Sequence, residues 1–266
     1  MKPETSTFRS TTGEQLFQRV WHAQTAPRAA LVLAHGLSEH SERYDHVGRF
    51  LAGQGVSVHS YDHLGHGRSG GPRGWVEDFQ HFLDDLALFH GAVAAGNPGL
   101  PLFLLGHSMG GLIVTAYLLE RPLKPDFVIL SSPAIVPIIE PDGRRIDATR
   151  LSKDPAVQEA YMTDPLVLRE RVTDDLMYRL ADGLSLLPQR AAEIDLPLLL
   201  IHGDADRLCS AEGARTYVES SSSDDREVII YPGGRHEMMN ETNRDEVLAD
   251  LWRWIDARLD GSDRSP

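Results

Sequence analysis

The feature that most constrains the fold of this chain is a series of short apolar runs rich in Leu, Val, Ile and Ala. Most of these runs are unbroken and do not alternate with polar residues, as expected of strands covered on both faces. Such strands form parallel sheets between two layers of helices. The runs are Ala29–Ala34, Val56–Tyr61, Leu102–Leu105, Phe127–Leu130, Leu198–Ile201 and Val228–Tyr231.

Helical patterns lie between most of these runs, with apolar residues recurring at spacings of three and four. The clearest are Arg43–Gly53, Phe79–Ala95, Met109–Glu120 and Glu241–Leu259. This alternation of strand and helix predicts an α/β fold with a mostly parallel, doubly wound sheet. Two earlier segments, Thr5–Ser10 and Gln15–Trp21, predict a hairpin at the edge of that sheet.

The strand pattern is absent from about Pro133 to Pro188. Apolar residues at helical spacing make this stretch amphipathic: Val172, Leu176, Leu180, Leu184 and Leu187. We expect a helical cap inserted over the carboxyl edge of the sheet, where such folds bind ligands. A pair of ordinary crossover helices is the alternative. The expected organisation is an α/β core at 1–132 and 189–266 with a helical cap at 133–188.

Length, charge and cysteine content limit the kinds of protein that this chain can be. A length of 266 residues suits one α/β domain with an insertion, and a net charge of −13 disfavours nucleic acid as a partner. The lone Cys209 excludes an intramolecular disulfide and fits a reducing compartment. Residues Met1–Ser10 lack the apolar core of a signal peptide, and no apolar run is long enough to span a bilayer. We therefore expect a cytoplasmic protein.

The strongest single motif is G-x-S-x-G, formed by Gly106, Ser108 and Gly110 between a predicted strand and a predicted helix. That context is the one a nucleophile elbow needs, because the sharp turn exposes the serine hydroxyl and requires small neighbours. The same residues in a chance match would make Ser108 an ordinary helix N-cap. We predict Ser108 as the nucleophile of a serine hydrolase.

A serine nucleophile needs a base and an orienting carboxylate, in the chain order Ser, acid, His in this fold. Only His202 and His236 follow Ser108, and His236 lies in a loop directly after the last strand. This placement predicts His236 as the general base. The acid is expected in the loop after the preceding strand, where Asp204 and Asp206 are both candidates and spacing favours Asp206 only weakly.

An oxyanion hole completes such a site with two backbone N–H donors. One is expected from Met109, directly after the nucleophile, and the other from Leu37, which follows a predicted strand through His35 and Gly36. The histidine pairs of this loop and of the loop near His63 and His66 could suggest a metal site. Because no cysteine or carboxylate cluster accompanies them, we expect no metal and no cofactor.

Three longer motifs carry a family resemblance. They run through residues 35–44 (HGLSEHSERY), 62–69 (DHLGHGRS) and 106–111 (GHSMGG), with 206–209 (DRLC) and 233–236 (GGRH) beside them. The chain resembles the monoglyceride lipase family of the α/β-hydrolase fold, whose members are serine hydrolases related to the S33 serine aminopeptidases. The resemblance extends over nearly the whole chain, from His35 to Asn240.

The resemblance implies Ser108, Asp206 and His236 as catalytic triad, and Leu37 and Met109 as oxyanion donors. It also implies that Glu39 and Arg43 help to form the polar pocket for glycerol, whereas a surface ion pair at helical spacing would contribute little. Animal members of the family carry a histidine near the glycerol exit where this chain has Met239, so the chain departs from the family pattern at this position.

Cys209 matches a family cysteine beside the acid loop. Its role is either a regulatory thiol or a small buried space-filler, and the second is favoured.

These observations predict a serine carboxylic-ester hydrolase that acts through an acyl-enzyme, with a small lipid ester as its substrate. A monoacylglycerol lipase is the favoured function, and lysophospholipase or broad-specificity carboxylesterase activity is the alternative within hydrolases. A non-enzymatic ligand-binding protein of the same fold is the alternative outside them. The apolar pairs Ile135–Val136 and Ile138–Ile139 could form a lip of the cap that touches a membrane or micelle transiently, or could belong to the core. The oligomeric state has no signature in the sequence.

Overall fold

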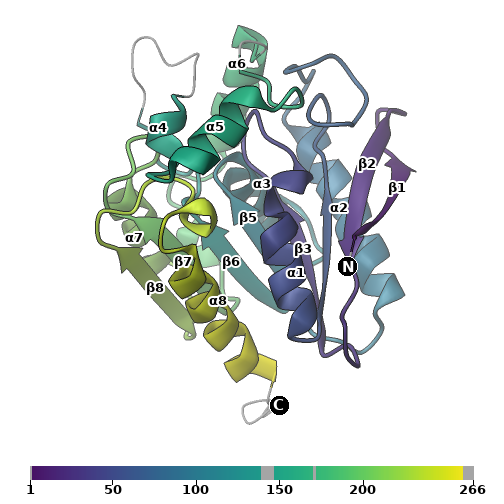
Figure 1. The fold of residues 1–266 in the computed structure, drawn as a ribbon, viewed down its shortest axis with the longest axis vertical. Helices are drawn as coiled ribbons and strands as arrows, with labels where there is room; N and C mark the ends of the chain where they lie inside the picture. The colour runs from purple at the N-terminus through teal and green to yellow at the C-terminus, as the bar shows by residue number, and fades with distance from the viewer. Residues whose placement is uncertain (1, 139–146, 170–171, 260–266) are drawn as a thin grey trace.

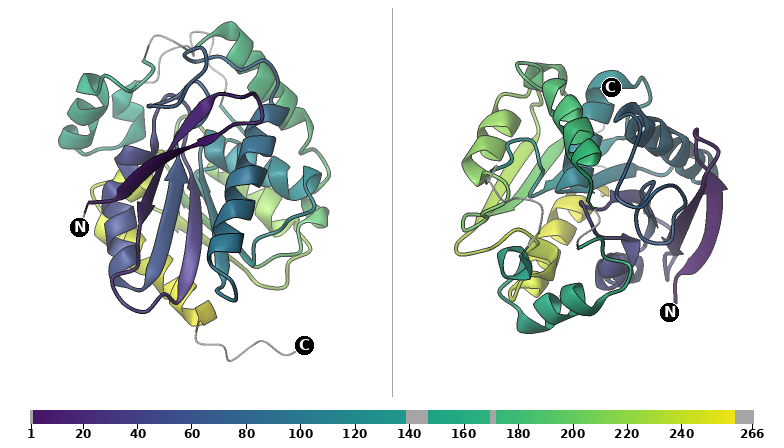
Figure 2. Two further views of the ribbon diagram at one scale, coloured as in Figure 1. Left: turned by 90° about the vertical axis from the view of Figure 1, so that its right-hand side faces the viewer. Right: turned by 90° about the horizontal axis from the view of Figure 1, so that it is seen from above.

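A computed structural model of the chain describes residues 2–138, 147–169 and 172–259. Eight strands form one sheet in the order β1-β2-β4-β3-β5-β6-β7-β8. All neighbouring strands from β4 to β8 in this order run parallel, and β1 and β2 form an antiparallel hairpin at the sheet edge (Figure 2, left). The strands are β1 (Glu4–Arg9), β2 (Gln15–Trp21), β3 (Ala29–Ala34), β4 (Val56–Tyr61), β5 (Leu102–His107), β6 (Phe127–Ser131), β7 (Leu198–Gly203) and β8 (Arg226–Tyr231). The predicted α/β fold and hairpin are confirmed.

Helices cover both faces of this sheet. Helices α1 (Asp45–Gly53) and α8 (Arg244–Leu259) lie in front of it in Figure 1, and α2 (Gln80–Gly96), α3 (Met109–Glu120) and α7 (Ala211–Glu219) cover the other face. Alternate residues of β3 enter opposite apolar clusters, Leu31 on the α1 side and Val32 on the α3 side, and neither is exposed. Burial on both faces explains why the strands lack alternation in the sequence.

Several predicted boundaries differ from those in the structure. Strand β5 extends past the predicted Leu105 to His107, because its parallel ladder continues with Ala34 paired to Gly106 and His107 paired to Ser131. Two predicted helices begin later, at Asp45 and Arg244, after the short 3₁₀ turns η1 (Ser41–Tyr44) and η3 (Met238–Asn240). Helix α7 was not predicted from the sequence.

The segment between β6 and β7 contains α4 (Ala148–Leu151), α5 (Pro155–Thr163), α6 (Asp174–Ser185) and the 3₁₀ turn η2 (Ala191–Glu193). Figure 1 shows α4, α5 and α6 above the sheet. Leu176 and Leu180 of α6 join the apolar cluster on the α3 side of the sheet, whereas α4 and α5 pack around a small separate cluster that includes Leu151 and Tyr161. The amphipathic stripe predicted in this region therefore packs on the main core.

Several backbone hydrogen bonds attach this segment to loops of the core. Among them, the Leu168 amide donates to the Ser38 carbonyl over 2.9 Å, and the Glu237 amide donates to the Leu151 carbonyl over 2.8 Å. Of the residues in the predicted apolar lip, Ile135 is buried and Val136 and Ile138 are exposed, while Ile139 lies outside the described residues. Within the described ranges, no helix is both long and apolar enough to cross a membrane.

Candidate active site

Ser108 lies at the sharp turn between β5 and α3, which we call the elbow. Its backbone φ is +52°, a conformation that costs free energy for a residue with a side chain. The two flanking glycines allow the turn, because a Cβ on Gly106 would lie 2.5 Å from the Gly110 oxygen and one on Gly110 would lie 2.1 Å from the Ala34 oxygen. Close backbone packing thus accounts for both glycines of the motif.

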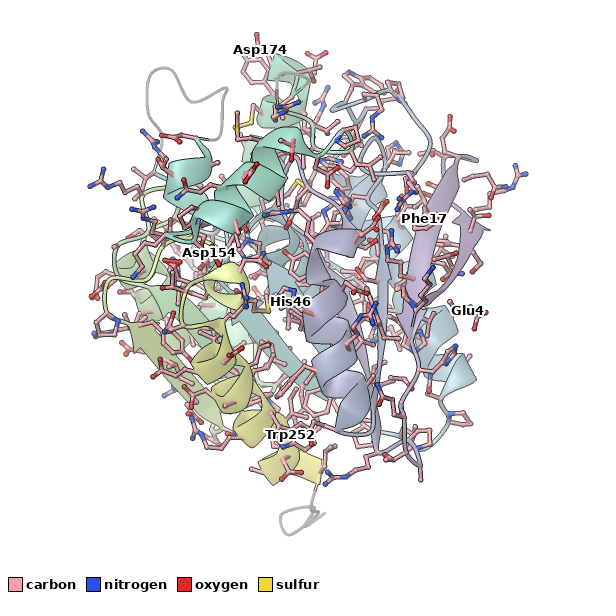
Figure 3. All side chains as sticks on the ribbon, viewed as in Figure 1. Glu4, Phe17, His46, Asp154, Asp174 and Trp252 are labelled. Atoms are coloured by element: carbon pink, nitrogen blue, oxygen red, sulfur yellow. The ribbon has the colours of Figure 1, made fainter. Side chains whose placement is uncertain are left out.

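The side chains of Ser108, His236 and Asp206 meet in one hydrogen-bonded chain. His236 Nε2 is 2.8 Å from Ser108 Oγ, and His236 Nδ1 is 2.7 Å from Asp206 Oδ2. The three residues come from the ends of β5, β7 and β8, so the parallel sheet brings together positions that are far apart in the sequence. The loop carrying His236 is also held at η3, where His46 of α1, which is labelled in Figure 3, donates from Nε2 to the Met239 carbonyl over 2.7 Å.

Asp206 is the carboxylate that faces His236, whereas Asp204 is exposed and accepts a hydrogen bond from the Gly233 amide over 2.5 Å. The Asp206 carboxylate accepts three further hydrogen bonds: from the amides of Leu208 and Cys209 to Oδ1 and from His202 Nε2 to Oδ2, the last over 3.0 Å. His202, to which the sequence reasoning gave no role, thus helps to hold the acid in place through a hydrogen bond to its carboxylate.

This environment separates the protonation of the acid from that of the base. Burial alone would raise the pKa of Asp206, but the charge of His236 and the hydrogen bonds from His202 and His236 hold it well below its usual range. Burial would lower the pKa of His236, but attraction to Asp206 outweighs burial and raises it. Asp206 therefore stays ionised and favours the protonated imidazole that appears when the serine loses its proton.

The two predicted oxyanion donors flank the elbow. Met109 is the first residue of α3, and Leu37 follows Gly36, whose Cα lies so close to the nucleophile that an added Cβ would be 3.2 Å from Ser108 Cβ. Among the described residues, neither the Leu37 nor the Met109 amide donates to a backbone carbonyl across a loop or turn. Both N–H groups are available to a ligand oxygen.

Glu39 and Arg43 belong to a buried charge cluster together with Glu237, which the sequence reasoning missed. Arg43 donates to Glu39 Oε2 over 2.8 Å and forms a bidentate pair with Glu237 at 2.5 and 2.7 Å. Glu39 and Glu237 are only 2% and 4% exposed, so the alternative of a surface ion pair is wrong. The i,i+4 spacing indicated the pair, but nothing local in the sequence pointed to Glu237, which lies 194 residues from Arg43.

The Glu39 carboxylate also connects this cluster to the oxyanion loop. Its Oε1 accepts the Gly36 amide over 2.6 Å and the Tyr44 hydroxyl over 2.5 Å. Arg43 additionally lies 5.0 Å from the ring centroid of Tyr161 in α5. A cavity of about 220 Å³ lies beside the cluster, lined by His40, Glu42, Arg43, Val157, Ala160, Asp164 and Asn240.

Met239 and Cys209 are both buried close to the site. Met239 is 2% exposed and packs in the apolar cluster on the α1 side of the sheet. Burial raises the pKa of the Cys209 thiol well above its usual value, which disfavours the reactive thiolate and agrees with a space-filling role. Within the described parts of the chain, no three His, Cys, Asp or Glu side chains are placed to hold a metal ion.

Comparison with known proteins places this geometry among hydrolases. The family model described as serine aminopeptidase, S33, matches residues 25–142 and 137–243. The monoacylglycerol lipase of Mycolicibacterium smegmatis is 37% identical over 95% of this chain and 96% of its own length. The human monoglyceride lipase is 32% identical over 92% of this chain and 88% of its own.

Two solved structures are similar over nearly the whole fold. A soluble variant of monoglyceride lipase from Saccharomyces cerevisiae, in complex with a substrate analog, has a TM-score of 0.83 at 24% identity and covers 97% of this chain and 95% of its own. The monoacylglycerol lipase of Paleococcus ferrophilus has a TM-score of 0.77 at 28% identity and covers 96% of this chain and 98% of its own.

Proposed function

This chain belongs to the monoglyceride lipase group of the serine aminopeptidase S33 family and is a carboxylic-ester hydrolase, and we propose that its substrates are monoacylglycerols. We also propose Ser108, Asp206 and His236 as its catalytic triad. The observation that carries the proposal is the continuous hydrogen-bonded chain from Ser108 Oγ through His236 to Asp206.

The proposed reaction proceeds through an acyl-enzyme. His236 Nε2 takes the proton of Ser108 as the hydroxyl oxygen attacks the ester carbonyl, and Asp206 stabilises the resulting imidazolium. The amides of Leu37 and Met109 bind the negative oxygen of the tetrahedral intermediate. His236 then protonates the departing glycerol oxygen, and afterwards it activates the water that releases the fatty acid.

The polar head of the substrate is proposed to bind on the Arg43 side of the elbow. Arg43 lines the 220 Å³ cavity together with His40 and Asp164, whose side chains are 2.9 Å apart, and this lining supplies donors and acceptors for hydroxyl groups. Arg43 is also paired with Glu39 and Glu237, so it would offer the head group a fixed donor and not a free charge. This assignment makes Arg43 a substrate-binding residue, and Glu39, which does not line the cavity, contributes to binding through its ion pair with Arg43.

The acyl chain is proposed to lie under the segment 133–188, which we treat as the cap. Several of its apolar side chains are exposed on the outside: Val136, Ile138, Met162, Met177 and Tyr178. Transient contact of these residues with a membrane or micelle would deliver the substrate, and with a net charge of −13 the attraction would be apolar rather than electrostatic. A cytoplasmic setting is part of the proposal and is supported by the free, buried Cys209.

Hydrolysis of monoacylglycerols of graded chain length by the wild-type protein and by Ser108→Ala tests this function. We expect the wild type to release fatty acid faster from monoacylglycerols than from lysophospholipids or short-chain esters. We also expect a fluorophosphonate probe to label the folded wild-type protein. Ser108→Ala should lose both. Activity that survives the substitution would contradict the mechanism, faster turnover of lysophospholipids would change the substrate class, and absent labelling would favour a ligand-binding protein.

A further inference from the structure

We propose that His35 is a positioning residue that aims the Leu37 amide at the oxyanion, and that His63 holds His35 in the tautomer this requires. The inference rests on the proposed function, because it concerns the donor that would stabilise the tetrahedral intermediate. It gives a role to the histidine before Gly36 and to the motif at residues 62–69, which the triad and oxyanion donors leave unexplained.

The hydrogen bonds of His35 define which of its ring nitrogens carries the proton. The backbone amide of His63 is 2.9 Å from His35 Nε2, and because an amide can only donate, Nε2 must be the bare acceptor. In the neutral ring the proton is then on Nδ1, which lies 2.8 Å from the Gly36 carbonyl oxygen and donates to it. Burial lowers the pKa of His35 well below its usual value, so the ring keeps this neutral form at working pH.

The Gly36 carbonyl belongs to the same planar peptide unit as the Leu37 N–H. In a trans peptide these two groups point in opposite directions, so a donor that fixes the carbonyl also fixes the direction of the N–H. A hydrogen bond accepted by the carbonyl also polarises the peptide and strengthens its N–H as a donor. His35 therefore acts on the oxyanion through the peptide bond, without touching the substrate.

Hydrogen bonds also hold the preceding peptide, between His35 and Gly36, at both its carbonyl and its amide. His63 Nε2 donates to the His35 carbonyl over 3.1 Å, so His63 binds His35 both through its amide and through its ring. On the other side, the Gly36 amide donates to Glu39 over 2.6 Å. Among the described residues, the His35 ring is the group that binds the carbonyl of the Gly36–Leu37 peptide. Gly36 itself packs close to the elbow, because a Cβ added to it would lie 3.2 Å from Ser108 Cβ.

A matched pair of substitutions isolates the critical hydrogen bond. In His35→Asn the side-chain amide nitrogen stands at the position of Nδ1 and can still donate to the Gly36 carbonyl. In His35→Gln the side-chain amide group stands at the position of Nε2, so it can accept the His63 amide but cannot reach Gly36. The two variants remove the same ring and differ in which bond they keep.

We expect His35→Gln to lower kcat by roughly 10-fold, less than the roughly 10²–10³-fold cost of deleting an oxyanion donor, because the Leu37 amide is misdirected and not lost. KM and the pH midpoint of kcat/KM, which the His236 base sets, should not move. His35→Asn should recover most of the rate.

Two inhibitors separate this effect from a general loss of structure. A long-chain trifluoromethyl ketone forms a hemiketal with Ser108 and places an oxyanion in the hole, whereas an alkyl glycerol ether binds without reacting. We expect His35→Gln to bind the ketone more weakly by the same factor as its loss in kcat, and to bind the ether as the wild type does.

A kcat for His35→Gln within twofold of wild type would overturn the inference. So would equal losses for ketone and ether, or a His35→Asn variant as slow as His35→Gln. Failure of the proposed function itself would be seen separately, as a wild-type protein that neither hydrolyses esters nor reacts with the fluorophosphonate.

Discussion

The buried charge cluster of Glu39, Arg43 and Glu237 makes a quantitative prediction about stability. In Arg43→Met the protein loses three charge-assisted hydrogen bonds and retains two carboxylates that are 2% and 4% exposed. Breaking a buried ion pair by removing one partner costs about 3–5 kcal/mol, because the remaining charge stays desolvated. We expect a loss of this size at pH 8, which is a large part of the roughly 5–15 kcal/mol that stabilises a typical domain.

Arg49→Met is the matched control. Arg49 pairs with Asp45 at the same i,i+4 spacing and at 2.6 Å, but the two side chains are 44% and 37% exposed. An exposed pair of this kind contributes about 0–1 kcal/mol, so burial and not spacing separates the two variants.

The assay is urea unfolding of both variants and the wild type at pH 8 and pH 6. Without Arg43, burial raises the pKa of the remaining carboxylates above their unfolded values, so the folded variant binds more protons than the unfolded chain. Its stability should therefore fall as pH rises, and its deficit relative to wild type should be smaller at pH 6 than at pH 8. Equal losses for Arg43→Met and Arg49→Met, or a deficit that grows at pH 6, would refute the reasoning.

Two further pairs of substitutions and a pH profile test the site itself. Asp206→Asn should lower kcat on the order of 10⁴-fold by favouring the wrong tautomer of His236, while Asp204→Asn should leave kcat nearly unchanged. In the wild type the base works unprotonated and Asp206 raises its pKa, so kcat/KM should increase with pH through a midpoint above about 6.5, and a midpoint below this value would contradict the assigned pairing. Gly110→Ala should abolish activity and lower the thermal midpoint, because its Cβ would lie 2.1 Å from the Ala34 oxygen, whereas Gly96→Ala has open space and should be neutral or stabilising by up to about 1 kcal/mol. Similar thermal midpoints for these two glycine variants would show that the elbow tolerates a side chain.

Much of this fold can be predicted from local patterns. The unbroken apolar runs indicated the strands from β3 to β8 and their parallel arrangement, because burial on both faces removes alternation from the sequence itself. The elbow could also be predicted from the sequence, because tight backbone contact allows only glycine at positions 106 and 110.

Local patterns do not show which side chains from distant parts of the chain will pair. Asp204 and Asp206 are two residues apart and chemically identical, and only the direction in which the β7 loop turns puts Asp206 against His236. The i,i+4 spacing of Glu39 and Arg43 suggested that these two residues pair, but it holds no information about Glu237.

The same limit applies to His35 and His63. In the sequence, nothing distinguishes either residue from the other histidines in loops. Their hydrogen bonds form because β3 and β4 are neighbours in the sheet and end side by side. Local sequence encodes which residues are buried and how the backbone bends, because these depend on a residue and its near neighbours. Which buried polar groups meet depends on the packing of segments far apart in the chain, and that is decided only when the sheet assembles.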